Sequence, residues 1–337
     1  MSPLPLAPAS VLKDDGTPAT GRYQGRVGQL DWHGLAAARA RPFWWHTLRH
    51  KRWQYLGIGS ADLFIGLAIV DLGWGCTAFA YLFDRQQRRL RAVWSKDGLK
   101  GLSGGVSASP VAGAWANFKA LGAHLQWQHE AASDSLTVSV RVPTLEVQAS
   151  VSLADAPPLL LAVGPIGEAG SGLAHATQKT AALPVHGWAR AAGQRFALDG
   201  AVASLDSSHG LLAHRTAWQW ACAHRPGLGF NLQAGYFGAH ENALWLDGQL
   251  IPLGAARFDF DAADPLSPWR VRTDDGLLDL DFQPEGARGE RRNLGLVASR
   301  YVQPVGTFSG HVRPSPGAAP RPVHDLLGVT EDHSSRW

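Results

Sequence analysis

One stretch of the second half of the chain gathers residue types that could do acid–base chemistry in an apolar setting. Asp206, His209 and His214 occur close together, and Trp218 and Trp220 follow a few residues later. A carboxyl group near indole rings is expected to have a raised pKa, so Asp206 would stay protonated and act as an acid. Indole faces would stabilise the cation formed when an alkene is protonated, and His209 or His214 would orient the acid or relay its proton. The alternative is an Asp-Ser-Ser turn that hydrogen-bonds its own backbone beside ordinary core tryptophans.

Four further side chains are candidates for binding a substrate. Trp245 and the preceding Glu241 lie on a later strand-like run, and Trp53 ends a Trp-rich cluster near the N-terminus. Asp71 interrupts an apolar run, where a carboxylate is costly unless it is hydrogen-bonded. Because Gly73 follows at once, turn formation is the favoured role for Asp71, and a raised pKa is the alternative.

Two histidine pairs are the only features of the sequence that suggest a metal site, and we expect that the protein binds no metal ion. His46 and His50 are four residues apart, as ligands on one helical face would be, but no carboxylate is near enough in sequence to orient either ring. His209 and His214 form the other pair. Elemental analysis of the purified protein would exclude a metal ion at either pair.

Polar residues at the middle and the end of the chain could belong to a cleft. His175, Gln178 and Lys179 lie at the predicted junction of two domains, and His186 opens the second domain; clefts between domains commonly bind ligands. The triple at residues 331–333, Glu-Asp-His, lies near the C-terminus. It is either part of a solvated tail, the default for a terminus, or part of a docked tail that closes the cleft.

The elements that must position these residues are predicted to be short antiparallel strands. Apolar and polar residues alternate over 136–142 and 145–151, and two more hairpins are expected over 244–252 and 258–282. With 38 Gly and 21 Pro, the composition excludes a helical bundle. The apolar run 63–83 is as long as a membrane span, but Asp71 at its centre favours two buried strands joined at 71–75. One helix is expected over 35–49. The predicted fold class is therefore all-β, as an antiparallel sandwich or barrel.

A Gly- and Pro-rich break near the middle of the chain suggests two β domains. The division that we predict is an extended segment over 1–24, a first barrel over 25–165, a linker over 166–182, a second barrel over 183–312 and a Pro-rich tail over 313–337.

Charge and cysteine content exclude several classes of partner. The formal net charge is +3 and no basic stripe is interleaved with aromatics, so nucleic-acid binding is not expected. Cys76 and Cys222 are predicted to be buried free thiols, as in a reducing cytoplasm. The first residues lack the features of a signal peptide. We expect a cytoplasmic protein with no transmembrane segment; peripheral membrane contact and oligomeric state stay open.

The chain resembles a bacterial family catalogued as domain of unknown function 2804, over nearly its whole length. The matching stretches are HKRWQYLGI, FIGLAIVDLGWGCTAFAYLFDR, HATQKTAALPVHG, SLDSSHG, RTAWQWACA, ENALWLDG, RFDFD, NLGLVASRYVQPVGTFSG and GVTEDHSSRW. More distantly it is similar to tandem lipocalin-like proteins, which include carotenoid 1,2-hydratase (hydroxyneurosporene synthase), AttH-type proteins and some fungal Diels-Alderases. This resemblance implies two lipocalin-like barrels with few short helices.

The resemblance also bears on the acid. In the hydratases an aspartate in a pattern like Tyr-His-Asp-His-Asn-Trp-Gly, after the opening strand of the second barrel, is the proposed proton donor. SLDSSHG matches it at Asp206 and Gly210 and differs at Leu205, Ser207 and His209. Asp206 therefore carries over as the candidate acid, whereas the partners that would stabilise a cation do not.

Two hypotheses of function follow. The first is a hydratase, isomerase or cyclase that acts without a cofactor on a hydrophobic, isoprenoid- or lipid-like substrate, with Trp218, Trp220 and Trp245 as the apolar wall. The second is a non-catalytic carrier or sensor of lipids or pigments, which needs only an apolar cavity. A raised pKa of Asp206 at a cavity favours the enzyme, and an Asp206 that caps its own turn favours the carrier.

Overall fold

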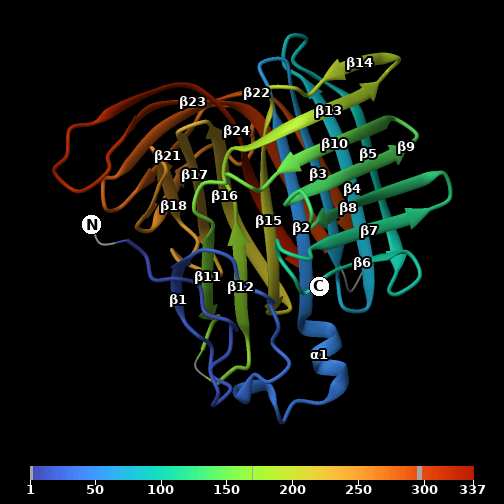
Figure 1. Ribbon diagram of the computed structural model, residues 1–337, viewed down its shortest axis with the longest axis vertical. Coiled ribbons are helices and arrows are strands. Elements are labelled where there is room, and N and C mark those ends of the chain that lie inside the picture. The colour runs from blue at the N-terminus through green and yellow to red at the C-terminus, as the bar shows by residue number, and fades with distance from the viewer. Residues whose placement is uncertain (1–2, 169, 294–297) are drawn as a thin grey trace.

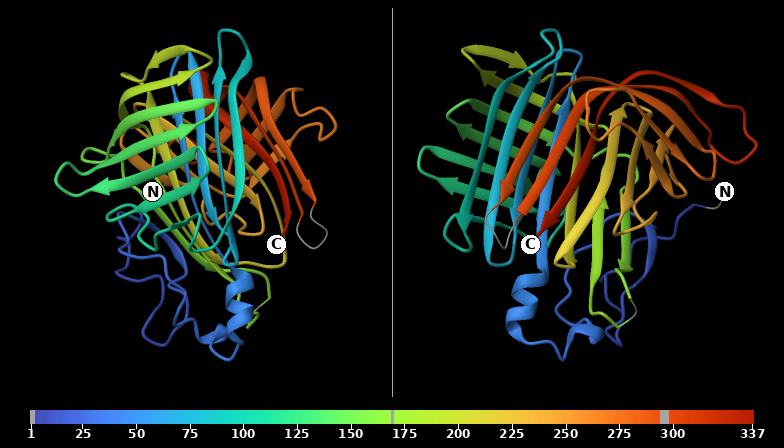
Figure 2. Two further views of the ribbon diagram at one scale, coloured as in Figure 1. Left: turned by 90° about the vertical axis from the view of Figure 1, so that its right-hand side faces the viewer. Right: turned by 180° about the vertical axis from the view of Figure 1, so that it is seen from behind.

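The protein, described here from a computed structural model over residues 3–168, 170–293 and 298–337, consists almost entirely of antiparallel strands (Figure 1). The strands form two curled sheets, one of 15 strands and one of 9. Each sheet wraps around its own hydrophobic core, so the molecule has two barrel-like halves (Figure 2). The all-β prediction and the prediction of two barrel-like units are confirmed.

The first sheet curls around a core of fully buried aliphatic side chains such as Leu136, Val138 and Val140. Its main path runs, in spatial order, through β5 (Arg89–Leu99), β4 (Gly75–Asp84), β3 (Leu63–Asp71), β2 (His50–Gly59), β15 (Val202–Leu211), β13 (Leu183–Ala191), β10 (Leu145–Ser152), β9 (Ser135–Val142), β8 (Ala123–Glu130), β7 (Trp115–Ala120) and β6 (Gly104–Val106). The strands off this path are β1 (Gly21–Gln24), β11 (Leu160–Pro165), β12 (Ala174–Lys179) and β14 (Gln194–Ala197).

The second sheet packs aromatic side chains into its core, among them Phe230, Trp269, Phe282 and Phe308. Its spatial order is β19 (Gln249–Pro252), β18 (Ala243–Leu246), β17 (Leu228–Gly235), β16 (Arg215–Arg225), β24 (Arg321–Arg336), β23 (Ala298–Val312), β22 (Leu278–Asn293), β21 (Trp269–Thr273) and β20 (Ala256–Asp259).

Local signals in the sequence predicted these hairpins well. Strands β9 and β10 pair with Val142 opposite Leu145. Strands β18 and β19 join at Asp247 and Gly248, whose φ angles of 50° and 79° fit a two-residue type I′ turn. The membrane-length apolar run forms the hairpin β3–β4.

The helix expected over 35–49 is only partly formed. A short 3-10 helix covers Ala36–Ala38, and α1 covers Phe43–Arg49 after Pro42. Pro42 separates the two because the residue before a proline is biased away from helical geometry. None of the described helices has the length and apolar character needed to cross a bilayer.

The sheets divide the chain later than the predicted linker. Strands β12, β13 and β15 all belong to the first sheet, and β15 pairs with β2 over its full length. The change of sheet falls between Leu211 and Arg215. The residues predicted as a Pro-rich tail contain β24, a central strand of the second sheet. Alternation of residue types indicates a strand but does not specify its partner.

The two sheets pack against each other through an aromatic layer. Tyr55 and Tyr81 from the first sheet contact Trp220, Cys222 and their neighbours from the second. Trp218, Trp220 and Cys222 share one face, as alternation predicted, but that face looks toward the other sheet and not into the core of their own.

Candidate functional site

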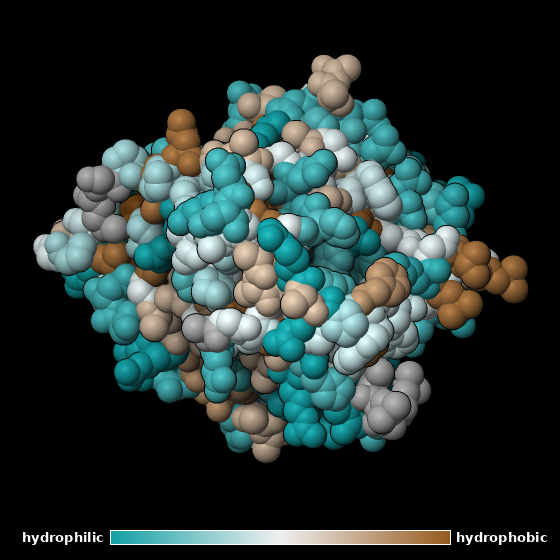
Figure 3. Space-filling view, turned by 90° about the horizontal axis from the view of Figure 1, so that it is seen from below, coloured by the Kyte–Doolittle hydropathy of each residue, from teal (hydrophilic) through white to brown (hydrophobic). Residues whose placement is uncertain are grey.

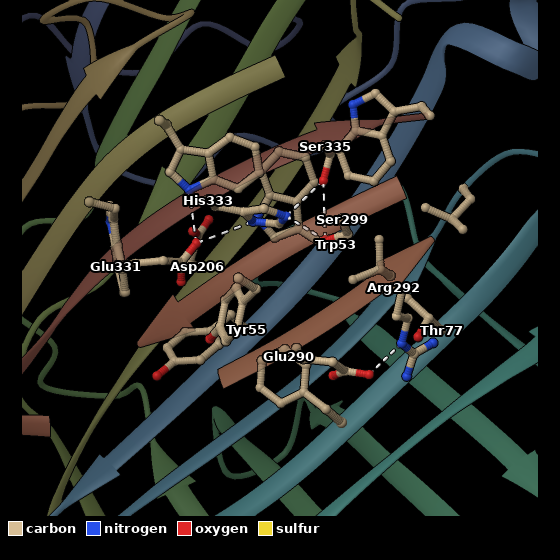
Figure 4. Close-up of a pocket in the computed structure, with 18 of the residues that line it drawn as sticks. Trp53, Tyr55, Thr77, Asp206, Glu290, Arg292, Ser299, Glu331, His333 and Ser335 are labelled. Carbon is tan, nitrogen blue, oxygen red and sulfur yellow. Dashed lines mark hydrogen bonds and ion pairs between the residues drawn. The ribbon is translucent and has the colours of Figure 1, made fainter. Parts of the chain in front are cut away.

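A cavity of about 280 Å³ lies between the two sheets (Figure 4). Its size is just below the range of about 300–1,000 Å³ that is typical of small-molecule sites. Its apolar walls are mainly aromatic: the first sheet contributes Trp53, Tyr55 and Phe79, and the second sheet with its loops contributes Trp218, Trp220, Tyr236, Tyr301 and Trp337.

Strand alternation places the polar side chains of the cavity. On β24 the residues Glu331, His333 and Ser335 are two apart and all line the cavity. On β15 Asp206 lines it, and Ser208 points the same way and donates a hydrogen bond to Asp206. Glu241 comes from the loop before β18.

Lys179 joins two carboxylates at the buried end of the cavity. Its Nζ lies 2.6 Å from Oδ2 of Asp206 and 2.7 Å from Oε2 of Glu241. Asp206 also accepts hydrogen bonds from the hydroxyls of Thr177, at 3.1 Å, and Ser208, at 2.8 Å. Asp206 therefore has three donors, and its negative charge is well satisfied.

Burial and charge act in opposite directions in this cluster. Burial raises the pKa of Glu241, and nearby Lys179 offsets only part of that rise. Burial alone would lower the pKa of Lys179, but Asp206 and Glu241 more than offset it, so the pKa of Lys179 is raised and the amine stays charged. The two carboxylates and one ammonium would together carry a charge of −1. Glu241 is thus the carboxyl group at which an extra proton is best held.

A second polar cluster lies on the other wall. Glu331 accepts hydrogen bonds from Nε1 of Trp218, at 2.9 Å, and Nε2 of Gln303, at 3.0 Å, and lies 3.5 Å from Nδ1 of His333. Nε2 of His333 faces the hydroxyl of Ser335 at 2.7 Å. The imidazole packs on the Trp218 ring, with centroids 4.1 Å apart. Glu331 is therefore placed to orient His333, whose Nε2 is also contacted by the hydroxyl of Ser299 at 3.1 Å. A proton would reach or leave this nitrogen through a serine hydroxyl.

Two further sets of buried polar groups lie at the cavity or directly beside it. The hydroxyls of Tyr55 and Tyr81 both donate to Oε1 of Gln303, and burial raises the pKa of each phenol, so both stay protonated. Both amide atoms of the buried Gln233 side chain lack a hydrogen-bond partner among the described residues. A ligand or water in the cavity would satisfy them.

Five of the predicted site residues line this cavity: Asp206, Trp218, Trp220, Trp53 and Glu241. Asp206 lies within β15, so it does not cap a turn. It also faces an ammonium group and two hydroxyls, and not indoles alone, which differs from the environment that the sequence suggested.

The structure places the two predicted histidines elsewhere. His209 is three residues from Asp206, so it points to the other face of β15, where its Nε2 contacts the carbonyl oxygen of Ser107 at 3.0 Å. Burial lowers the pKa of His209 far below its usual range. His214 is exposed in the connection after β15. Neither lines the cavity.

Trp245 and Asp71 also lie outside the cavity. Trp245 is buried in a separate cluster and donates from Nε1 to the carbonyl oxygen of Pro158 at 2.6 Å. Asp71 pairs with Arg52 and accepts a hydrogen bond from the backbone N–H of Gly73 at 2.8 Å, which is the expected turn role. The part of the chain that the structure describes contains no group of three metal-ligating side chains.

Several residues of the site had only weak sequence signals. Lys179 and the 331–333 triple stood out as polar residues, but their roles depend on pairings between distant strands. Tyr55, Gln233 and Gln303 had no sequence signal except their position in an alternating strand. Residues two apart on a strand share a face, which is the local cue that could have grouped Tyr55 with Trp53, and Gln303 with Tyr301.

Comparisons with known proteins support the fold. The model of a family described as "Domain of unknown function (DUF2804)" matches residues 6–337. A protein from Nitrosomonas europaea described as a candidate AttH is 13% identical with a TM-score of 0.59, over 86% of this chain and 92% of that one. A search of curated proteins returned no match.

Two other solved structures have the same fold. Kievitone hydratase from Nectria haematococca is 12% identical with a TM-score of 0.54, over 99% of this chain and 98% of that one. CghA, solved with Sch210972, is 12% identical with a TM-score of 0.57, over 98% of this chain and 97% of that one. At these identities the likeness concerns the fold, and it agrees with the tandem barrels that the resemblance implied.

Proposed function

The chain belongs to the DUF2804 family, and we propose that it is a cofactor-independent enzyme that protonates a hydrophobic, isoprenoid- or lipid-like substrate in the cavity between its two sheets. The reaction class is hydration, isomerisation or cyclisation. The observation that carries the proposal is a buried acid cluster, Asp206–Lys179–Glu241, at the end of a cavity walled by aromatic rings.

The cluster supplies the proton. Burial raises the pKa of Glu241, so the transferable proton is assigned to Glu241, and Asp206 positions the ammonium group of Lys179 that both carboxyl groups share. Transfer of this proton to a substrate double bond forms a C–H bond and leaves a carbocation. The indoles of Trp218 and Trp220 line the same cavity and would stabilise that charge.

The opposite wall completes the reaction. His333, oriented by Glu331, would accept a proton through the hydroxyl of Ser335, which passes its own proton to Nε2 and takes one from the reacting molecule. A proton taken from an attacking water gives a hydrated product, and a proton taken from a neighbouring carbon gives an isomer. Attack by a second double bond of the substrate would close a ring. The alternative function, a lipid or pigment carrier, needs the aromatic walls but neither polar cluster.

Solvent-isotope incorporation tests the proposal even when the product is unidentified. Small molecules extracted from protein purified from its own host, together with geraniol and farnesol, would be incubated with the protein in D₂O and analysed by mass spectrometry. We expect carbon-bound deuterium in one of these compounds. Asp206→Asn and Glu241→Gln should each lower the rate by about 10²–10⁴-fold, while quenching of tryptophan fluorescence on binding persists.

Two outcomes would contradict the proposed enzymatic function. Binding without deuterium incorporation would favour the carrier. Unchanged rates in both variants would show that the acid lies elsewhere.

A further inference from the structure

The cavity opens at one end of the molecule. Its lining residues Lys179 and Glu241 are each 4% exposed, whereas Trp74, in the turn between β3 and β4, is 41% exposed. Trp337, the last residue of the chain, also lines the cavity. A ligand would therefore enter between the β3–β4 turn and the C-terminus, beside α1 (Figure 1).

Helix α1 at this end exposes an apolar face. Phe43 is 86% exposed, Trp44 62% and Leu48 48%, while Trp45 is buried against the protein. A surface helix normally turns polar residues to solvent. The β3–β4 turn packs directly on α1, because a Cβ built on Gly73 would lie 2.0 Å from the carbonyl oxygen of Thr47. Trp74, the next residue, therefore lies near the C-terminal end of α1, and it also lines the cavity.

A basic groove lies beside the entrance. Arg215 is directly opposite Arg336 across β16 and β24, and Arg291 is directly opposite Arg300 across β22 and β23. All four line one groove, together with the small side chains of Ala217 and Ser334. Like charges placed directly opposite each other in a sheet are unfavourable. Arg300 is already paired with Asp332, so Arg215 and Arg291 are the arginines of the groove that an anionic partner would engage. Among the described residues, Arg215 and Arg291 form no ion pair.

The groove, the helix and the entrance are contiguous. The N–H of Leu212 donates to the carbonyl oxygen of Arg49 at the end of α1, at 2.8 Å, three residues before Arg215. The N–H of Trp337 donates to the carbonyl oxygen of His214 at 2.9 Å. Ser299, Ser335 and Arg336 line both the cavity and the groove. Seen from this end, the surface is mainly hydrophilic, with separate hydrophobic side chains projecting from it (Figure 3).

From this juxtaposition we propose that the end formed by α1, the β3–β4 turn and the arginine groove docks on an anionic membrane surface, from which a hydrophobic ligand enters the cavity. Aromatic side chains favour the membrane interface, and arginines favour anionic headgroups. The entry of a substrate from the membrane rests on the proposed function. Membrane binding itself does not, because a protein without enzymatic activity could bind the membrane in the same way.

Vesicle co-sedimentation tests the docking surface. We expect the full-length protein to bind vesicles of phosphatidylcholine and phosphatidylglycerol and to bind pure phosphatidylcholine vesicles more weakly. Each arginine contributes roughly fivefold to binding an anionic surface, so a variant with both Arg215→Gln and Arg291→Gln should bind roughly 25-fold more weakly. A variant with both Phe43→Ser and Trp44→Ser should lose at least about tenfold.

The matched control is Leu121→Ser, which removes a fully exposed leucine from the β7–β8 turn. It should bind anionic vesicles like the wild type. Absence of vesicle binding, or equal binding by all variants, would overturn the inference and leave the proposed acid chemistry untouched. Self-association that depends on Phe43 and Trp44 would also overturn it, because a second copy would then be the partner of α1.

Discussion

At the scale of single residues, the proposed chemistry depends on Lys179, which holds two carboxylates together in a buried site. Burying one carboxylate is costly, and burying two without a cation is much more so. The charge of Lys179 offsets one of the two carboxylates and leaves a net charge of −1, so the cluster favours binding one further proton.

Replacing this lysine should therefore destabilise the fold in a pH-dependent way. We expect Lys179→Met to lower the free energy of unfolding by about 3–5 kcal/mol at neutral pH. The deficit should shrink as the pH falls, because the folded variant takes up protons on its carboxyl groups at higher pH than the unfolded chain does. Urea unfolding at several pH values would measure it, with exposed Lys96→Met as the control. A deficit independent of pH would show that lost packing, and not charge, dominates.

The sequence predicted some residues of the cavity and missed others. Asp206, Glu241, Trp218 and Trp220 were identified by residue type and spacing, and all four line the cavity. His209 was grouped with Asp206 by proximity in sequence, although their odd spacing on one strand sends them to opposite faces. The bridging role of Lys179 was not predictable, because it depends on β12 pairing with β15.

At the scale of elements, β24 has the largest consequences. It pairs with β16 on one side and β23 on the other, and it carries Glu331, His333 and Ser335 into the cavity. The Pro-rich segment before it suggested a tail, but β-branched and apolar residues from Val323 to Val329 pack into the sheet.

Truncation would distinguish a structural strand from a tail. A chain that ends before Arg321 should lose the second sheet, since β16 and β23 would both expose unpaired edges. We expect it to aggregate, or to lose the cooperative unfolding transition seen by circular dichroism. Removing Trp337 alone should keep that transition. A soluble, cooperatively folded truncated chain would contradict the place of β24 in the sheet.

At the scale of the whole molecule, the site belongs to neither barrel-like half. Strand periodicity predicted two such halves, each with its own core, and the resemblance led to the expectation of a site at the second barrel. The cavity lies instead between the sheets, with Asp206 and Lys179 from one and Glu331 and His333 from the other. The sequence also suggested a cleft at the junction of two domains, with Lys179 and the 331–333 triple as possible parts of it, and these residues contribute to the cavity. Periodicity shows which residues share a face but not which two faces meet, so the strands that wall the cavity could not be read from the sequence.

Packing of one sheet on the other also sets the electrostatics. Glu241 is buried at the end of the cavity between the sheets, and this burial raises its pKa above the usual range. A group with a raised pKa contributes most to folding stability below its unfolded pKa, and that contribution is lost as the pH rises through the folded pKa. Because Glu241 is also the proposed proton donor, the pH at which it loses its proton tests the proposal directly.

The most direct measurement is the infrared titration of that carboxyl group, comparing wild type with Glu241→Gln. A protonated carboxyl band should persist above the ordinary glutamate pKa of about 4.3 and be missing from the variant. Titration of Glu241 at or below that ordinary value, or an identical band in both proteins, would contradict the account.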